Sequence, residues 1–240
     1  MSLNIKGNII SSNDISSLGI FETKVNRDGL VLYLDAGNLD SYPTTGTTWT
    51  DLSGTGNNAT LVSGATYNSS SGGTIDFDGS NDYVTAGNSG MTHRTNDFSY
   101  CLWKNVTTTD IIYNRTLFSN AVYTNGLLIR PYTNSVIEIY AQNVNYGSFT
   151  YVATQNAWKY LCFVRYGSQL YFFVNGVYSQ VMTFTPDIQP NSSTLYIGAS
   201  GHAVSQCFLG KIGSVHVYDR ALNPYEIAEN FQSTKGRYSL

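Results

Sequence analysis

Many short apolar segments, separated by turn-forming residues, run along most of this chain of 240 residues. Gly, Asn, Asp and Ser stand between the segments, and these residues favour tight turns. A helix would need longer runs with a 3.6-residue period, whereas short runs at this spacing are typical of antiparallel strands. The pattern therefore predicts an all-β chain. Strands are expected at residues 29–35, 73–77, 83–86, 98–106, 116–119, 127–130, 136–141, 158–165, 169–174, 177–184, 195–199 and 210–218.

The sharpest local prediction is a β-hairpin around Asn175 and Gly176. The run LYFFV precedes this pair, and the run VYSQV follows it. An Asn-Gly pair between two apolar strands supplies the positive φ angles of a type I′ turn. The two flanking runs are therefore expected to pair as antiparallel strands.

The composition suits a sheet protein with an uncharged polar surface. Apolar residues make up 42% of the chain and charged residues 12%, and 19 residues are Tyr, a type that favours strands. The net charge of -3 does not suit binding to a phosphate backbone, so no nucleic-acid partner is expected. No apolar run approaches the roughly 18 residues that span a bilayer, so no membrane insertion is expected.

The strand pattern divides the chain into two parts. Residues 1–28 show neither strand alternation nor a helical period, and we expect them to form an N-terminal arm or anchoring segment. Residues 29–240 are expected to form one β-sandwich domain, in which the turn-rich stretch 36–73 sends Trp49 and Leu52 into the core. The start of the sequence has no apolar stretch resembling a signal peptide, so synthesis in the cytosol is expected.

One helix is predicted near the C-terminus. Asn223 can cap it, Pro224 stands at the first helical position, and Glu226 completes a capping box. The helix is expected to pack on the sandwich and to end near Gly236.

The three cysteines, Cys101, Cys162 and Cys207, each lie within an apolar strand-like run. They allow at most one disulfide. Buried free thiols are the expected state, because cysteine is among the residues most often buried as a small hydrophobe.

Four stretches of the sequence carry a family resemblance. They are IDFDGSNDYV at 75–84, FSYCLW at 98–103, the segment 158–176 that begins with Trp158 and ends in Asn-Gly, and KIGSVHVYDRALNPYEI at 211–227. In this order they resemble the laminin-G-like, pentraxin-related branch of the concanavalin A-like lectin/glucanase superfamily. The resemblance implies a two-sheet antiparallel jelly-roll sandwich with a short C-terminal helix. One departure is Gly213-Ser214, where the family often has Asp-Glu.

The segment 29–58 is similar to a version of this domain found in structural proteins of tailed bacteriophages. Asp35-Ala-Gly-Asn and TTWTDLSG at 47–54 carry that similarity. It implies a virion component exposed on the particle surface, with the arm contacting other virion proteins. Such a component is expected to form a homo-oligomer. By analogy with phage fibres, among which trimers are common, this oligomer would be a trimer.

Catalysis is not expected. Glycosidases of the superfamily carry Glu-x-Asp-x-x-Glu on one strand, and none of Glu22, Glu138, Glu226 and Glu229 begins that motif. The three histidines, His93, His202 and His216, are scattered along the sequence. His216 alternates with valines, so we expect it to face solvent or a polar neighbour rather than a metal.

A calcium site is the main metal hypothesis. Asp76, Asp78, Asn81 and Asp82 place hard oxygen ligands around one turn, and related domains bind calcium at the rim of the sandwich. The same residues also form an ordinary β-turn in which Asp accepts hydrogen bonds from its own backbone, and the sequence favours this structural interpretation.

Carbohydrate binding is the main ligand hypothesis. Tyr123, Asn125 and Tyr132 lie in or near loops, where aromatic rings can stack on sugar rings and amides can bind hydroxyl groups. The alternative is that these tyrosines pack across strands.

The sequence thus favours a non-enzymatic virion protein that presents a lectin-like domain for assembly or for binding a host-surface glycan. The alternative is a free carbohydrate-binding lectin, which could depend on calcium. A glycan-degrading enzyme is the third and least supported hypothesis, because the catalytic carboxylate motif is missing.

Overall fold

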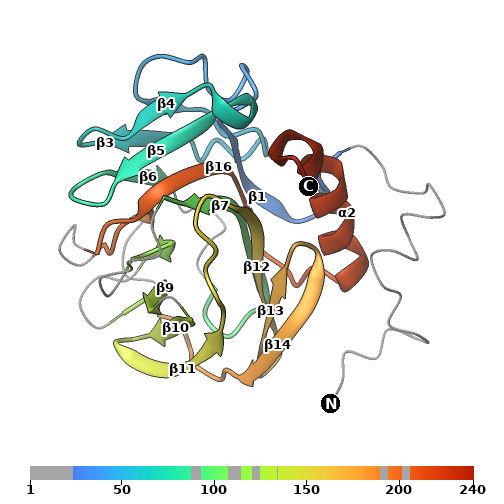
Figure 1. Ribbon diagram of the computed structural model, residues 1–240. Coiled ribbons are helices and arrows are strands. Elements are labelled where there is room, and N and C mark those ends of the chain that lie inside the picture. The colour runs from blue at the N-terminus through green and yellow to red at the C-terminus, as the bar shows by residue number, and fades with distance from the viewer. Residues whose placement is uncertain are drawn as a thin grey trace.

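Two antiparallel sheets stack face to face and enclose the main core (Figure 1). The computed structural model describes residues 24–87, 93–107, 115–120, 125–133, 135–189, 194–201 and 206–240. The expected all-β, two-sheet antiparallel jelly-roll sandwich with a short C-terminal helix is confirmed. Among the described residues, no helix is long and apolar enough to cross a membrane.

Sheet A has the strand order β14-β13-β12-β7-β16-β5-β4, and β1 also pairs with β16. Its strands are β1 (Leu30–Asp35), β4 (Thr66–Asn68), β5 (Thr74–Asp78), β7 (Phe98–Val106), β12 (Trp158–Tyr166), β13 (Gln169–Val174), β14 (Val177–Thr183) and β16 (Leu209–Tyr218).

Sheet B has the order β11-β10-β9-β8-β15-β6-β3-β2. Its strands are β2 (Thr48–Trp49), β3 (Ala59–Val62), β6 (Tyr83–Gly87), β8 (Phe118–Ser119), β9 (Leu127–Thr133), β10 (Val136–Ala141), β11 (Val144–Thr150) and β15 (Thr194–Ile197).

Aromatic rings fill the space between the two sheets. Phe172 of β13 stacks on Phe149 of β11 and on Phe163 of β12, with ring centroids 5.1 and 5.0 Å apart. All three side chains are fully buried. A buried Phe side chain contributes roughly 1.5–3 kcal/mol, so this stack helps to hold sheet B on sheet A.

A second apolar cluster covers the outer face of sheet A. Helix α2 (Pro224–Thr234) and the 3-10 helix η2 (Lys235–Tyr238) lie there, beside β1 and β12 (Figure 1). Trp103 of β7 stacks against Phe231 and Tyr238, and its indole nitrogen donates to the Thr234 hydroxyl at 2.8 Å. Burial on both sides explains why every residue of β7 is buried.

The predicted start of the C-terminal helix is confirmed. The Asn223 side chain accepts from the Glu226 backbone at 3.0 Å, and the Glu226 carboxylate accepts from the Asn223 backbone at 2.8 Å. Pro224 occupies the first turn. The helical segment continues through η2 and so extends slightly beyond the expected end at Gly236.

The expectation of three free thiols is wrong for two of the cysteines. Cys101 of β7 and Cys162 of β12 are directly opposite each other in the ladder, with Cα atoms 4.1 Å apart, and they form a disulfide. Cys207 is a buried free cysteine, as expected. The pairing depends on the register of two strands that are distant in sequence, which the spacing of the cysteines does not reveal.

The strand prediction missed four strands. β2, β3 and β4 lie inside the stretch expected to be only turns, and β11 lies in a polar segment. β2, β3 and β4 are short, and β11 is largely exposed, so none forms an apolar run. Trp49 is fully buried as predicted, whereas Leu52 is only partly buried and packs against the outer cluster of sheet A.

Residues 24–28, expected from the sequence to belong to the arm, contact the domain. Val25 is buried in the outer cluster of sheet A. The Asn26 backbone donates to the Asn230 side chain at 2.8 Å and accepts from the Tyr218 hydroxyl at 3.0 Å. The division of the chain into an arm and a domain stays a prediction, but these contacts place residues 25 and 26 with the domain.

Candidate binding surface

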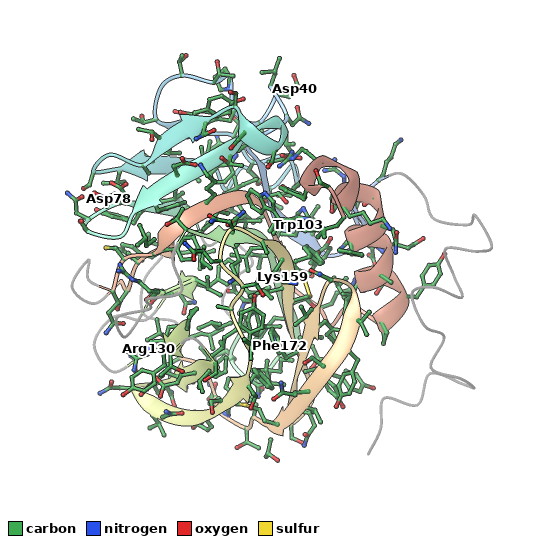
Figure 2. All side chains as sticks on the ribbon, viewed as in Figure 1. Asp40, Asp78, Trp103, Arg130, Lys159 and Phe172 are labelled. Carbon is green, nitrogen blue, oxygen red and sulfur yellow. A yellow bond between two sulfur atoms is a disulfide. The ribbon has the colours of Figure 1, made fainter. Side chains whose placement is uncertain are left out.

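A polar cluster occupies the outer face of sheet B where β9 and β10 pair. Arg130 of β9 lies directly opposite Glu138 of β10. Its guanidinium donates two hydrogen bonds to one Glu138 carboxylate oxygen, at 2.9 and 3.1 Å, and a third to the Tyr140 hydroxyl at 3.0 Å. Figure 2 shows Arg130 at the outer side of this strand pair. We call Arg130, Tyr132, Glu138, Tyr140 and Asn145 the β9–β10 face.

Strand alternation places these side chains on one face. Ile129, Ile137 and Ile139 point into the core, so their neighbours Arg130 and Glu138 point outward. The same alternation in the sequences LLIRPYT and VIEIYA was the signal available for this cluster. Of this cluster, only Tyr132 was predicted from the sequence as a binding residue.

Two tyrosine rings flank the arginine of the β9–β10 face. The Arg130 guanidinium carbon lies 4.5 Å from the centre of the Tyr140 ring and 5.9 Å from that of Tyr132. Asn145 of β11 adds an exposed amide that donates to Glu138 at 3.3 Å and to the Tyr140 hydroxyl at 3.4 Å. The face therefore offers aromatic rings beside fixed donors and acceptors, the groups with which proteins bind sugar rings and their hydroxyls.

The three residues predicted to bind carbohydrate do not form one cluster. Tyr123 lies outside the described residues. Asn125 precedes β9 and Tyr132 lies near its other end, so at about 3.3 Å per residue they are roughly 20 Å apart. Of the described pair, only Tyr132 belongs to the β9–β10 face.

The acidic turn after β5 is held by its own hydrogen bonds. The Asp78 carboxylate accepts from the Ser80 backbone at 2.7 Å and from the Asn81 backbone at 3.4 Å. The buried Asp82 carboxylate accepts from the Asp78 backbone at 2.9 Å. Burial, followed by the nearby Asp78 charge, raises the Asp82 pKa even though this backbone bond lowers it. Figure 2 shows Asp78 at the tip of this turn, apart from Arg130.

Asp76 does not complete a calcium site with this turn. One of its carboxylate oxygens binds the Lys211 ammonium at 2.5 Å and the Asn68 amide at 2.9 Å. A cation bound there would have to displace that ammonium. In the part of the chain that the structure describes, no group of three His, Cys, Asp or Glu residues could hold a metal. These contacts do not fit calcium and favour the structural interpretation of the turn.

Two of the described glutamates, Glu138 and Glu226, have structural partners. Glu138 is bound to Arg130 on the outer face of sheet B, whereas Glu226 is bound to Arg220 at 2.7 Å on the helix that covers sheet A. The sandwich separates these two carboxylates. They are therefore not placed to act as the close pair that glycoside hydrolysis requires.

The described histidines are buried rather than exposed. His216 has no solvent exposure, which corrects the expectation that it could face solvent. One ring nitrogen lies 3.4 Å from the Tyr160 hydroxyl, and burial lowers the His216 pKa to about 4. His93 lies 2.9 Å from the Tyr100 hydroxyl, and burial lowers its pKa to about 3. His202 lies outside the described residues.

Residues 78–228 match the family model described as the concanavalin A-like lectin/glucanases superfamily. The match extends over more than half of the chain. The chain belongs to this superfamily. A search of curated proteins gave no match.

Solved structures share the superfamily fold at low sequence identity. The receptor binding domain of botulinum neurotoxin C/D mosaic serotype has a TM-score of 0.69 at 14% identity, over 86% of this chain and 52% of that one. The binding domain of Paraclostridial Mosquitocidal Protein 1 gives 0.67 at 16% identity, over 86% and 52%. A third structure is of botulinum neurotoxin type C, a toxin whose cell entry depends on interaction with two ganglioside molecules. It gives a TM-score of 0.67 at 13% identity, over 87% of this chain and 52% of that one.

This chain spans about half the length of those toxin binding domains. The remaining half of each toxin chain has no counterpart in the alignment. Identities of this size show a shared fold. The superfamily membership and the jelly-roll sandwich are what these comparisons establish.

Proposed function

We propose that this chain is a non-catalytic glycan-binding domain. The observation that carries the proposal is the β9–β10 face, in which two tyrosine rings flank an arginine already fixed by a carboxylate. Such a surface pairs an aromatic platform with pre-oriented hydrogen-bonding groups, so little side-chain freedom is lost on binding. Membership of a lectin superfamily and the ganglioside-dependent toxin relative support the same class of ligand.

The test is a glycan array probed with the full chain, followed by two variants at one position. Tyr140→Ala removes the ring, whereas Tyr140→Phe keeps the ring and removes only the hydroxyl. We expect Tyr140→Ala to weaken binding at least about fivefold and Tyr140→Phe to retain most of it, if the ring stacks on the sugar. Tyr166→Ala is the matched control, because Tyr166 is exposed at the far end of β12. Equal binding by Tyr140→Ala and the unchanged chain would remove the β9–β10 face from the proposal.

We also propose that the domain serves in the virion of a tailed bacteriophage, exposed on the particle surface and joined to other virion proteins through its N-terminal segment. The similarity of residues 29–58 to phage domains supports this role. Mass spectrometry of purified particles should detect the chain among the structural proteins, and negative-stain microscopy should reveal its oligomeric state. Absence of the chain from intact particles would argue for a free lectin instead.

A further inference from the structure

A polar pocket lies on the opposite side of the sandwich from the β9–β10 face. It has a volume of about 310 Å³ and lies between the outer face of sheet A and the C-terminal helical segment. Residues of β1 and β16 line it on one side, and residues of α2 and η2 line it on another. Figure 1 shows α2 beside β1. Its volume is at the lower end of the range for small-molecule sites, which suits one sugar ring rather than a long chain. Its polar lining includes Lys24, Arg27, Tyr33, Asp35, Ser214, Ser233 and Arg237.

Small residues on β16 make room for this arrangement. A Cβ atom on Gly213 would lie 2.2 Å from the Tyr238 hydroxyl, so a larger residue would displace Tyr238 from the wall. Ser214 is directly opposite Asp35 in the β1–β16 ladder. Its hydroxyl is buried near the Tyr238 hydroxyl, without a hydrogen bond of normal geometry. A buried hydroxyl left without a partner costs free energy unless a water or a ligand binds it.

The floor of the pocket offers both donors and acceptors. Arg237 binds one Asp35 carboxylate oxygen, while the other receives only a long contact of 3.4 Å from the Tyr33 hydroxyl. The Arg237 side chain also has one buried N–H group, on Nε, without a partner. A carboxylate oxygen that receives only one long contact can still accept a hydrogen bond from a ligand hydroxyl.

The mouth of the pocket is positively charged. Lys24 and Arg27 are exposed there, and neither forms a salt bridge within the part of the chain that the structure describes. The Arg27 guanidinium lies over the Tyr33 ring, 5.1 Å from its centre, and donates to the Leu52 carbonyl. Its remaining N–H groups can bind a carboxylate, for which arginine has a matching geometry.

From this arrangement we propose that the pocket binds a sugar acid: a monosaccharide unit whose hydroxyls contact Asp35, Tyr33 and Ser214 and whose carboxylate contacts Arg27 and Lys24. The proposal concerns a second site, separate from the β9–β10 face and on the other sheet. It stands on the cavity and its unpaired groups, and it does not require that face to bind a glycan.

Four small ligands test the proposal with the full chain, by calorimetric or NMR titration. Glucuronate carries both the hydroxyls and the carboxylate, glucose lacks the charge, acetate lacks the hydroxyls, and phosphate presents a different anion. We expect glucuronate to bind at least about tenfold more tightly than any of the others, since it alone satisfies both ends of the pocket. Its affinity should fall as salt rises, because exposed charges are screened. Equal affinity for acetate would overturn the sugar part of the proposal, and equal affinity for glucose would overturn the charge part.

Matched variants locate the binding. Arg27→Gln should weaken glucuronate binding at least about fivefold without lowering Tm by more than a few degrees, because Arg27 is exposed. Arg94→Gln makes the same charge change at an exposed arginine paired with Asp187 and should leave binding unchanged. An equal loss in both variants would mean general charge attraction and would overturn the assigned site.

The glucuronate titrations test the pocket independently of the glycan array, which tests the β9–β10 face. Tyr140→Ala should retain glucuronate binding if the two sites are separate. If only Arg27→Gln loses glucuronate binding and the glycan array shows no binding, the pocket is supported as a binding site and the β9–β10 face is rejected as one. If glucuronate does not bind but a glycan on the array binds in a way that depends on Tyr140, only the proposal for the pocket is rejected.

Discussion

The carboxylate of Asp51 holds together the loop that links β2 to β3. It accepts backbone hydrogen bonds from Tyr33 at 2.9 Å, Ser53 at 2.8 Å and Asn57 at 3.0 Å, and it accepts from the hydroxyls of Ser53 and Thr55. Burial alone would raise the Asp51 pKa, but these hydrogen bonds outweigh burial, and the pKa lies below its usual value. Asp51 of the TTWTDLSG segment therefore has a structural role, because it holds this loop together.

We predict that Asp51→Ala lowers the free energy of unfolding by about 3 kcal/mol at pH 7, because several donors lose a charged acceptor. The folded-state pKa is depressed, so the stabilisation is present above the unfolded pKa near 4 and is lost as the pH falls below it. Urea unfolding at pH 7 and pH 3 checks both statements. Asp40→Ala, at an exposed aspartate, should have little effect. A gap between the Asp51 variant and the unchanged chain that stays constant with pH would contradict this account.

Lys104 is a buried cation without a carboxylate partner among the described residues. Its ammonium lies over the Tyr151 ring, 4.8 Å from the centre, and the side chain is almost fully buried. Burial, with a smaller contribution from the Lys159 charge, lowers the Lys104 pKa to about 7. The charged form is therefore costly in the folded state.

We predict that Lys104→Met stabilises the fold at pH 6, by up to about 4 kcal/mol, and that the gain shrinks as the pH rises towards 10. Between the folded pKa near 7 and the unfolded value near 10.5, only the unfolded chain holds the proton, so the stability of the unchanged chain rises with pH there. Thermal unfolding at pH 6 and pH 9 measures the effect. Lys159→Met should act in the same direction but more weakly. A gain that does not depend on pH would point to packing instead of charge.

At the level of elements, apolar runs were sufficient to locate most strands. The bounds expected for 98–106, 136–141 and 169–174 coincide with β7, β10 and β13. Asn175 and Gly176 both have positive φ, at 52° and 79°, as the type I′ hairpin requires. These features depend on neighbouring residues in sequence, which is why the sequence could predict them.

Pairings between distant segments were not predictable from the sequence. β3 is short, and β11 is mostly exposed, so neither produces an apolar run. The disulfide and the Arg130–Glu138 pair both depend on register, which only the folded sheet defines. For the same reason the sequence predicts Tyr132 as a binding residue but not Arg130 and Tyr140, its neighbours on the β9–β10 face.

The disulfide between β7 and β12 gives a prediction at this level. Alkylation of the denatured, non-reduced protein should label only Cys207, whereas reduction first should label all three cysteines. The bond closes a long loop, since its cysteines are 61 residues apart, and in the chain-entropy model such a bond adds up to about 4 kcal/mol. Reduction should therefore lower Tm, and Cys101→Ala should remove that response to reductant. Labelling of three thiols without reduction would show that the pair is not bonded.

At the scale of the whole molecule, the two sheets present different surfaces. Sheet A is covered by α2 and η2, which leave the polar pocket beside β1, while sheet B exposes the β9–β10 face. The sandwich core lies between the two sites. Because the core between them is closely packed, we expect the binding free energies at the two sites to be additive.

The contacts of residues 24–28 lead to a prediction about where the folded unit begins. Removal of residues 1–28 deletes buried Val25 and the hydrogen bonds of Asn26 to Asn230, Glu226 and Tyr218, whereas removal of residues 1–23 keeps them. We expect the shorter protein to unfold at a temperature about 5–10 °C below that of the longer one, since a loss of a few kcal/mol corresponds to such a shift in a domain of this size. Calorimetry of the two truncated proteins measures this difference. Val25→Ser in the longer protein should reproduce part of the loss, because it leaves the hydrogen bonds of Asn26 in place. Identical melting temperatures would mean that these contacts do not stabilise the sandwich, and the folded unit would then begin at β1.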